Sequence, residues 1–559
     1  MKLRCIMKRA ESSLGYEIAA ASFALLLAAP VFSQGVAPAV SCASLAKLAL
    51  PETTITLAQE YAAGEYKASA PRFGPPPGAP GAPGGAPVAT PPGGLGDGLR
   101  AGGPAGGPGA GSLLLNSMGY ISGPIPAFCR VTAIAKPTSD SNIRIDIVLP
   151  VSGWNGKMIA VGGGGGIGDI GGLSGLTRGY AFANAGDAGP TLEVASNPDK
   201  TIDFSYRTVH VMTVHAKEII KAYYGSDPKH SYWFGHSAGG YQGLQEAARY
   251  PKDYDGIGIG WPPNPAALFN ATQLWPDWWI AHNPAMLIPH EKYPMIHQAV
   301  LDLCDARDGV KDGIITEPQY CKFQPKSLLC KGADAADCLT APQVELLEKI
   351  YQGPTNPRTG EVYYPGPAPG EELEELWSFA SGSGRPVGQN VFKNFLFKDA
   401  NWDWKTVNWD GDVEKALAVS RMYAVLPEDL KNFGPSGSKM LIYIGWENYH
   451  NPAQMIDFYK DSVKAMGEAN AAKNFRLVTM PGVFQPNPPL FNVLTAIEDW
   501  VEKDKAPDQL LGTYIDESGK PLRTRPLCAY PKVPTYKGTG DTDKAENFYC
   551  EDSKFAKKK

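Results

Sequence analysis

The sequence predicts an α/β fold with a mainly parallel sheet and a large inserted segment. Three observations support this prediction. First, a strand-like apolar run ends in a Gly-x-Ser-x-Gly sequence, and a helical pattern follows it. Second, strand-like and helical patterns alternate on either side of this sequence. Third, residues 261–436 lose this alternation. Alternating strands and helices form parallel sheets covered by helices, so we expect the chain to fold around one such sheet.

The Gly-x-Ser-x-Gly sequence runs from Gly235 to Gly239, with Ser237 at its centre. Its order of strand, sharp turn and helix is that of the nucleophile elbow of α/β-hydrolases, which lifts the serine hydroxyl above the sheet edge. The following helix directs the positive end of its dipole towards a developing oxyanion. A Gly/Ser turn in another type of βα unit is the alternative, and the flanking strand and helix favour the elbow.

A glycine-rich segment at 162–168 follows the strand predicted for Met158–Val161. In an α/β-hydrolase, a loop at this place donates one backbone N–H to the oxyanion hole, and the residue after the serine donates the other. We therefore expect Gly164, Gly165 and Ala238 to form the oxyanion hole. A phosphate-binding loop is the alternative, but the segment lacks the Gly-Lys-Ser/Thr ending of such loops.

The remaining patterns predict further elements and the domain limits. Asn142–Pro150 alternates with a period of two, as a strand does, and Phe204–Tyr224 has the pattern of an amphipathic helix. Residues 34–68 have helix-like character. Short strands are also expected at Tyr180–Asn184, Tyr254–Gly260 and Lys439–Gly445. The predicted organisation is an N-terminal segment at 34–125, an α/β-hydrolase core at 126–260 and 437–559, and a lid domain at 261–436.

The first 33 residues have the features of a secretory signal peptide. Basic residues precede an apolar run from Ile18 to Val31, and Val31 and Ser33 stand at the −3 and −1 positions of a cleavage site before Gln34. The apolar run is shorter than the roughly 18 residues of a membrane-spanning helix. We therefore expect a secreted or periplasmic protein without a stable membrane anchor.

The composition excludes some partners and identifies one low-complexity segment. The net charge is −5, and no basic patch is interleaved with aromatic residues, so a nucleic-acid partner is not expected. Residues 71–111 consist mainly of Gly, Pro and Ala, which bury too little apolar surface to offset the entropy of ordering. We interpret this segment as a flexible surface insertion.

The cysteines are consistent with an oxidising compartment. One of the nine, Cys5, lies in the removable segment, which leaves an even number in the mature chain. Even numbers of cysteines in exported proteins indicate disulfides. Short spacing favours three pairs, Cys304–Cys321, Cys330–Cys338 and Cys528–Cys550.

A short acidic loop inside the predicted lid indicates a calcium site. Asp305, Asp308 and Asp312 are separated by short intervals, and Gly309 and Gly313 follow the last two of them. Ca²⁺ prefers such hard oxygen ligands, and the backbone carbonyls of Val310 and Ile314 could complete the set. The loop does not fit an EF-hand. A solvated acidic turn is the alternative, and we expect structural Ca²⁺ away from the chemistry.

Eight motifs form a specific set, namely Pro126–Val131, Gly153–Lys157, Arg178–Ala181, Tyr254–Ile257, Cys304–Cys321, Asn401–Trp404, Trp500–Glu502 and Ala506–Asp508. Together they resemble those of the tannase/feruloyl esterase family, which includes fungal tannases, feruloyl esterases and the bacterial hydrolase of mono(hydroxyethyl) terephthalate. The resemblance covers nearly all of the mature chain. It implies secretion, a lid, structural Ca²⁺, hydrolysis of aromatic-acid esters, and the disulfide Cys42–Cys129 besides the three pairs above.

The chain departs from this family at the residues that carry catalysis. The family's elbow cysteine is replaced by His236, its acid in Gly-Trp-x-Asp by Asn448, and its histidine in Pro-Gly-Met-Gly-His-Cys by Gln485. The cysteine that follows that histidine is also absent, so the disulfide between the two cysteines is lost with the acid and the base. Only Ser237 of the triad remains. Glutamine cannot accept the serine proton near neutral pH, which argues against efficient triad catalysis.

Other histidines offer possible replacements for the base. A relocated base at His450, oriented by Glu447, is one hypothesis, whereas His236 is more simply a packing residue. Three functions remain open. The chain hydrolyses aromatic esters through Ser237, binds an aromatic ligand without hydrolysis, or performs other chemistry with Ser237 and the glycine-rich loop as polar groups.

Overall fold

The computed structural model describes most of the chain after residue 35. The described residues are 36–66, 125–162, 173–186, 189–373, 380, 382–446, 450–483, 489, 491–515 and 520–555. The predicted signal peptide and the insertion at 71–111 lie outside these ranges.

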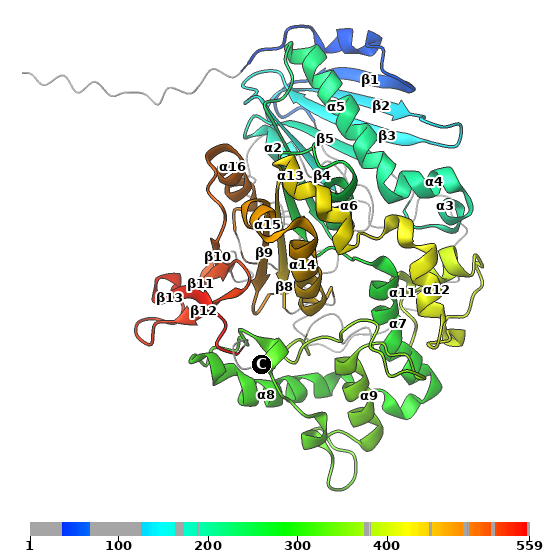
Figure 1. Ribbon diagram of the computed structural model, residues 1–559, viewed down its shortest axis with the longest axis vertical. Coiled ribbons are helices and arrows are strands. Elements are labelled where there is room, and N and C mark those ends of the chain that lie inside the picture. The colour runs from blue at the N-terminus through cyan, green and yellow to red at the C-terminus, as the bar shows by residue number, and fades with distance from the viewer. Residues whose placement is uncertain are drawn as a thin grey trace, which may run out of the picture. The chain divides into compact units, whose positions relative to one another are not determined.

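A nine-stranded sheet forms the centre of the fold, in the order β1-β2-β3-β5-β4-β6-β7-β8-β9. Strands β1, β2, β3 and β5 pair antiparallel, and the pairs from β5 through β4 to β9 are all parallel. Figure 1 shows β1 to β3 at one end of this sheet and β8 and β9 at the other. The predicted α/β class with a mainly parallel sheet is confirmed. The strands are β1 (Thr53–Tyr61), β2 (Phe128–Ala135), β3 (Ile143–Pro150), β4 (Lys157–Gly162), β5 (Ala181–Gly186), β6 (His230–His236), β7 (Gly256–Gly260), β8 (Lys439–Gly445) and β9 (Phe475–Met480).

Helices cover both faces of the central strands. Strand β7 is buried along its whole length, and its alternate residues face opposite layers. Ile259 faces the elbow helix α6, whereas Gly258 faces Ile497 of α16. Helix α5 packs on β3 and β5. The helices around the sheet are α2 (Leu173–Leu176), α3 (Leu192–Ser196), α4 (Pro198–Ile202), α5 (Thr208–Tyr224), α6 (Ala238–Arg249), α14 (Pro452–Met466), α15 (Glu468–Asn474) and α16 (Val493–Lys503).

The helix-like character expected for residues 34–68 is wrong. The segment contains a short 3₁₀ helix at Cys42–Lys47 and then strand β1. Thr53–Tyr61 alternates between more and less exposed residues over its first half, and it pairs along its length with β2. Its β-branched residues suit a half-buried strand, and that tertiary pairing outweighs local helical preference.

Residues 261–436 form helices that pack around apolar clusters of their own. One cluster includes Ile296, Leu346 and Leu347. Another joins Trp275 and Phe392 to residues near the elbow, including Tyr241 of α6, so this segment contacts the elbow helix directly. The helices here are α7 (Ala266–His282), α8 (Tyr293–Cys304), α9 (Ala341–Gln352), α11 (Pro386–Asn390), α12 (Asp412–Val419) and α13 (Phe433–Ser436).

The C-terminal part adds two small antiparallel sheets beyond the core. One pairs β10 (Gln509–Ile515) with β11 (Pro521–Cys528), and the other pairs β12 (Lys532–Tyr536) with β13 (Phe548–Asp552). The four predicted disulfides are confirmed, and the last of them joins these two sheets. They are Cys42–Cys129, Cys304–Cys321, Cys330–Cys338 and Cys528–Cys550. Among the residues described, none of the helices combines the length and the apolar character that crossing a bilayer requires.

Candidate active site

The backbone at Ser237 has the sharp turn that the elbow motif predicts. Strand β6 ends at His236 and helix α6 begins at Ala238, so Ser237 alone forms the turn, with φ 52° and ψ −116°. A positive φ is sparsely populated by residues other than glycine and costs on the order of 1–3 kcal/mol. Two hydrogen bonds hold this conformation. The Ser237 N–H donates to Gly260 O at 2.9 Å, and the Tyr241 N–H donates to Ser237 O at 3.0 Å.

The glycines of the motif permit two close backbone contacts. A Cβ atom at Gly235 would lie 2.0 Å from Gly239 O, and one at Gly239 would lie 2.2 Å from Gly162 O. Neither position therefore has space for any other residue. The second contact seats the start of α6 against the end of β4, where the glycine-rich segment begins.

This contact places the start of α6, which begins at Ala238, against the end of β4. Ala238 is the first residue of α6, and the first N–H groups of a helix have no partner within the helix. Its N–H is therefore available at the turn. Gly164 and Gly165, the other predicted donors, lie outside the described residues.

The hydroxyl of Ser237 forms no hydrogen bond with a base in the described part of the chain. None of the described side chains forms a hydrogen bond with Ser237 Oγ, so no Ser–His pair is formed there. Ser237 itself is half-buried. A nucleophilic serine normally donates a hydrogen bond to the base that removes its proton, and this element is missing from the described geometry.

His236, the residue before the serine, packs in the core. It is 8% exposed, and its ring lies against Trp261 with 4.9 Å between ring centroids. Burial lowers the pKa of His236 to about 3. The side chain is therefore neutral at physiological pH and behaves as a buried aromatic group.

His450, the candidate relocated base, is also a buried ring. It is fully buried and stacks on Phe269 of α7 with 4.8 Å between ring centroids. Burial, together with the nearby His236 and Arg385, lowers the pKa of His450 well below its ordinary value. A general base must stabilise the proton that it accepts, and this environment disfavours the imidazolium. Glu447, which was expected to orient His450, lies outside the described residues.

The positions of the substituted acid and base follow β8 and β9. Asn448 and Gln485 lie outside the described residues, but the residues before them are in contact. The Trp446 N–H donates to Met480 O at 3.0 Å, and a Cβ atom at Gly445 would lie 2.0 Å from Val483 O. Because β6, β8 and β9 run in the same direction, both loops leave the sheet at the edge that carries Ser237.

Residues 129–551 match the family model described as tannase and feruloyl esterase. The chain belongs to the tannase and feruloyl esterase family. An uncharacterized esterase of Xanthomonas campestris pv. campestris is 34% identical over 498 residues, which cover 78% of this chain and 86% of that protein. Feruloyl esterase B of Aspergillus niger is 26% identical over 462 residues, which cover 76% of this chain and 86% of that protein.

Solved structures agree with this fold. Feruloyl esterase B from Aspergillus oryzae aligns with a TM-score of 0.75 and 24% identity, covering 91% of this chain and 99% of that one. Tannin acyl hydrolase from Aspergillus niger aligns with a TM-score of 0.64 and 19% identity, covering 78% of this chain and 88% of that one. The family resemblance inferred from the motifs is therefore confirmed, whereas the roles of Asn448 and Gln485 stay predictions.

The loop predicted to bind calcium in this family member is held by its own hydrogen bonds. Asp305 accepts from the N–H groups of Asp312 and Gly313 at 3.2 and 3.0 Å. Asp308 accepts from the Val310 N–H at 2.9 Å and from the Thr316 hydroxyl at 2.5 Å. Burial, opposed by these two hydrogen bonds, and the nearby Asp312 and Asp305 carboxylates raise the pKa of Asp308. The loop thus concentrates negative charge in a partly buried place.

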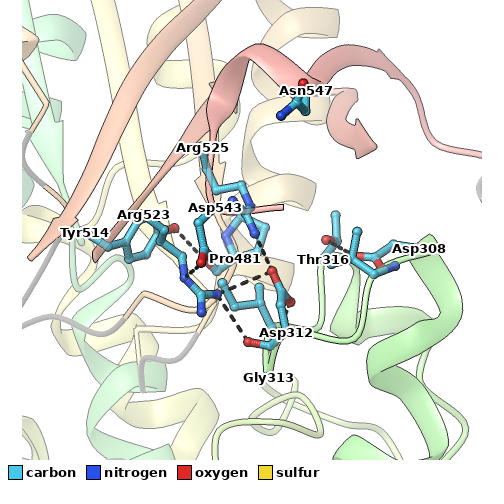
Figure 2. Close-up of polar contacts among 12 residues, drawn as sticks. Asp308, Asp312, Gly313, Thr316, Pro481, Tyr514, Arg523, Arg525, Asp543 and Asn547 are labelled. Carbon is cyan, nitrogen blue, oxygen red and sulfur yellow. Dashed lines mark hydrogen bonds and ion pairs between the residues drawn. The ribbon is translucent and has the colours of Figure 1, made fainter. Parts of the chain in front are cut away.

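Two arginines that the sequence did not indicate reach this loop from strand β11. Figure 2 shows Arg525 and Arg523 directed at Asp312. Arg525 forms an ion pair with the Asp312 carboxylate, and Arg523 Nη1 lies 3.4 Å from the same oxygen. Their spacing of two residues places both on one face of a strand, which is the only sequence signal that could have revealed them.

The same loop supports the beginning of the segment that carries Gln485. A Cβ atom at Gly482 would lie 2.9 Å from the side chain of Ile314, so the two loops touch. The Tyr514 hydroxyl donates to Pro481 O at 2.9 Å from the other side. A cavity of about 20 Å³ between these elements is lined by four of the five predicted calcium ligands, Asp308, Val310, Asp312 and Ile314.

Proposed function

We propose that this family member hydrolyses carboxylic esters of aromatic acids at Ser237, slowly, because the acid and the base of the triad are substituted. The observation that carries the proposal is the backbone of Ser237, held at φ 52° between β6 and α6. Such strain persists only where the surrounding structure enforces it, and it clusters at functional sites. The elbow therefore keeps the geometry of a nucleophile although its partners have changed.

In the proposed reaction, Ser237 Oγ attacks the ester carbonyl. The N–H of Ala238, with one from Gly164 or Gly165, stabilises the oxyanion. The bond to the alcohol then breaks, the alcohol leaves with a proton from solvent, and water hydrolyses the acyl-enzyme to release the acid and restore Ser237. Loss of a triad's base lowers turnover on the order of 10⁶-fold. The oxyanion hole and substrate binding alone still leave a rate about 10³–10⁴-fold above that of the reaction in water. A solvent base or His450 would have to take the serine proton. The buried environment of His450 disfavours its protonated form, so solvent is the better candidate.

A second candidate function is the binding of an aromatic ligand without hydrolysis. It is supported by the absence, in the described part of the chain, of any hydrogen bond to Ser237 Oγ. It is also supported by the neutral buried rings of His236 and His450, which make this region more apolar than a triad would. A repurposed enzyme that uses Ser237 as a polar group would share these features.

We also propose that the loop at 305–314 binds Ca²⁺ and that the chain is exported. Three carboxylates and two carbonyls are the hard oxygen ligands that Ca²⁺ prefers, and four of these residues line one small cavity. Asp312 would divide its charge between the ion and Arg525. Four disulfides support an oxidising compartment, and the features of residues 1–33 support a signal peptide.

The experiment compares hydrolysis of methyl ferulate, methyl gallate and a p-nitrophenyl ester by the wild type, Ser237→Ala and His450→Ala. The proposal predicts slow turnover by the wild type that Ser237→Ala abolishes and His450→Ala leaves largely intact. Equal loss in both variants would assign the base to His450. If the wild type hydrolyses none of the three esters faster than Ser237→Ala does, the hydrolase proposal is wrong, and ligand binding becomes the better hypothesis.

A further inference from the structure

A second group of potential metal ligands lies at the opposite end of the elbow helix from Ser237. It consists of His210 on α5, Glu246 on α6 and Asp253 in the turn between α6 and β7. Each residue offers one ligand atom, and the three atoms all lie within 4.8 Å of one another. Across the described ranges of the chain, no other group of three His, Cys, Asp or Glu residues meets this condition.

Glu246 is the residue of this group whose burial calls for a bound cation or a proton. Its side chain is fully buried, and no N–H or hydroxyl group of the described residues donates a hydrogen bond to either carboxylate oxygen, whose acidic neighbour is the Asp253 carboxyl. Lys217, a cation whose charge acts on Glu246, donates its hydrogen bond to the backbone carbonyl of Asp253. A buried carboxylate without a partner is costly, so the site calls for a positive charge or a proton.

The other two side chains are already directed at this position. His210 Nδ1 lies 2.6 Å from Asp253 Oδ2, and the imidazole stacks on Tyr250 with 3.6 Å between ring centroids and 6° between planes. The stacking fixes the ring so that Nδ1 faces the two carboxylates. Bonds of about 2.0–2.2 Å to a shared ion would require only a small separation of these two atoms.

We propose that His210, Glu246 and Asp253 bind a divalent transition-metal ion of the zinc type, with solvent completing the coordination. An imidazole nitrogen beside two carboxylates suits Zn²⁺, whereas Ca²⁺ and Mg²⁺ prefer oxygen ligands alone. His210 and Asp253 are partly exposed, which gives the ion a path from solvent. Because the ligands come from α5, α6 and the turn before β7, the ion links the C-terminal end of the elbow helix α6 to α5 and to that turn. Its role is structural.

The test measures metal binding directly, without relying on activity. The full-length protein is stripped with a chelator, incubated with micromolar Zn²⁺ and desalted, and its zinc content and thermal midpoint are measured. We expect one tightly held zinc ion per chain and a higher midpoint. His210→Ala and Glu246→Gln should each lose the ion, whereas Asp308→Asn, in the calcium loop, should keep it.

The partly exposed position of His210 makes His210→Ala the variant that should fold even if Glu246→Gln does not. Circular dichroism checks that each variant is folded. The proposal is overturned if the stripped wild type retains no zinc, or if folded His210→Ala retains it as the wild type does. Glu246 would then be neutralised by a proton, since burial and the Asp253 carboxylate raise the pKa of Glu246 well above its ordinary value.

Discussion

Replacing Gly239 by alanine tests whether the elbow depends on the contact between α6 and the end of β4. The new Cβ would lie 2.2 Å from Gly162 O. A carbon atom needs about 3.3 Å from a carbonyl oxygen, so the helix start must move by roughly 1 Å. Because Gly162 O is a backbone atom and the position of a Cβ is fixed by its own backbone, no side-chain rotation can relieve the overlap.

This displacement sets the expected size of the effect. Overpacking a close contact costs about 1–3 kcal/mol, and the backbone contact here places Gly239→Ala at the upper end, about 3 kcal/mol. A misplacement of about 1 Å between nucleophile and oxyanion donors can lower the rate about 10²-fold. We therefore expect both a lower free energy of unfolding and a loss of ester hydrolysis.

The assay pairs denaturant unfolding with hydrolysis of a p-nitrophenyl ester. Gly332→Ala is the matched control, because a Cβ at Gly332 meets no atom within 4 Å. It should differ from the wild type by less than about 0.5 kcal/mol and keep its rate. Gly239→Ala with the stability and rate of the control would refute the reasoning that the two glycines enforce the elbow.

Three further predictions concern His236, the disulfide Cys304–Cys321 and Arg525. Burial lowers the pKa of His236 to about 3. Below pH 6.5, His236 therefore binds a proton in the unfolded chain but not in the native chain, and the free energy of unfolding falls by about 2 kcal/mol by pH 5. His236→Phe should remove this part of the acid sensitivity in pH-dependent unfolding, and His282→Phe at an exposed site should not. Replacing both cysteines of Cys304–Cys321 by serine should lower the free energy of unfolding by about 3 kcal/mol, measured by denaturant unfolding under oxidising conditions, since the bridge joins residues that are 17 positions apart in the sequence. Arg525→Gln leaves the Asp312 carboxylate with a weaker partner, so the midpoint of thermal unfolding should fall. Added Ca²⁺ should raise the midpoint of this variant by more than it raises that of the wild type. An unchanged midpoint would show that this ion pair does not hold the loop.

The sequence predicted those features that depend on neighbouring residues. The elbow around Ser237 is one such feature, because the strand, the turn and the helix are all contained in about twenty residues whose order is diagnostic. The three short-range disulfides are another, and the family resemblance supplied Cys42–Cys129. The prediction from local pattern was wrong where pairing between distant strands decides the structure. Strand β1 is such a case, because its partner β2 lies beyond the insertion.

Contacts between distant segments were not predictable from local patterns. Arg525 reaches Asp312 across 213 residues, and neither residue has a local signal for the other. The group of His210, Glu246 and Asp253 is likewise assembled by the packing of α5 on α6 and by the turn into β7. Only the folded arrangement shows that Glu246 is buried and that no N–H or hydroxyl group of the described residues donates a hydrogen bond to its carboxylate.

Rebuilding the triad tests the central claim most directly. The claim is that the elbow at Ser237 is intact and that hydrolysis is limited by the substituted acid and base. The measurement is kcat for methyl ferulate in the double variant Asn448→Asp, Gln485→His, compared with the wild type and with the same variant carrying Ser237→Ala. We expect a gain of at least about 10²-fold, in line with what general base catalysis contributes, and its complete loss with Ser237→Ala. No gain in a folded double variant, or a gain that survives Ser237→Ala, would contradict the account.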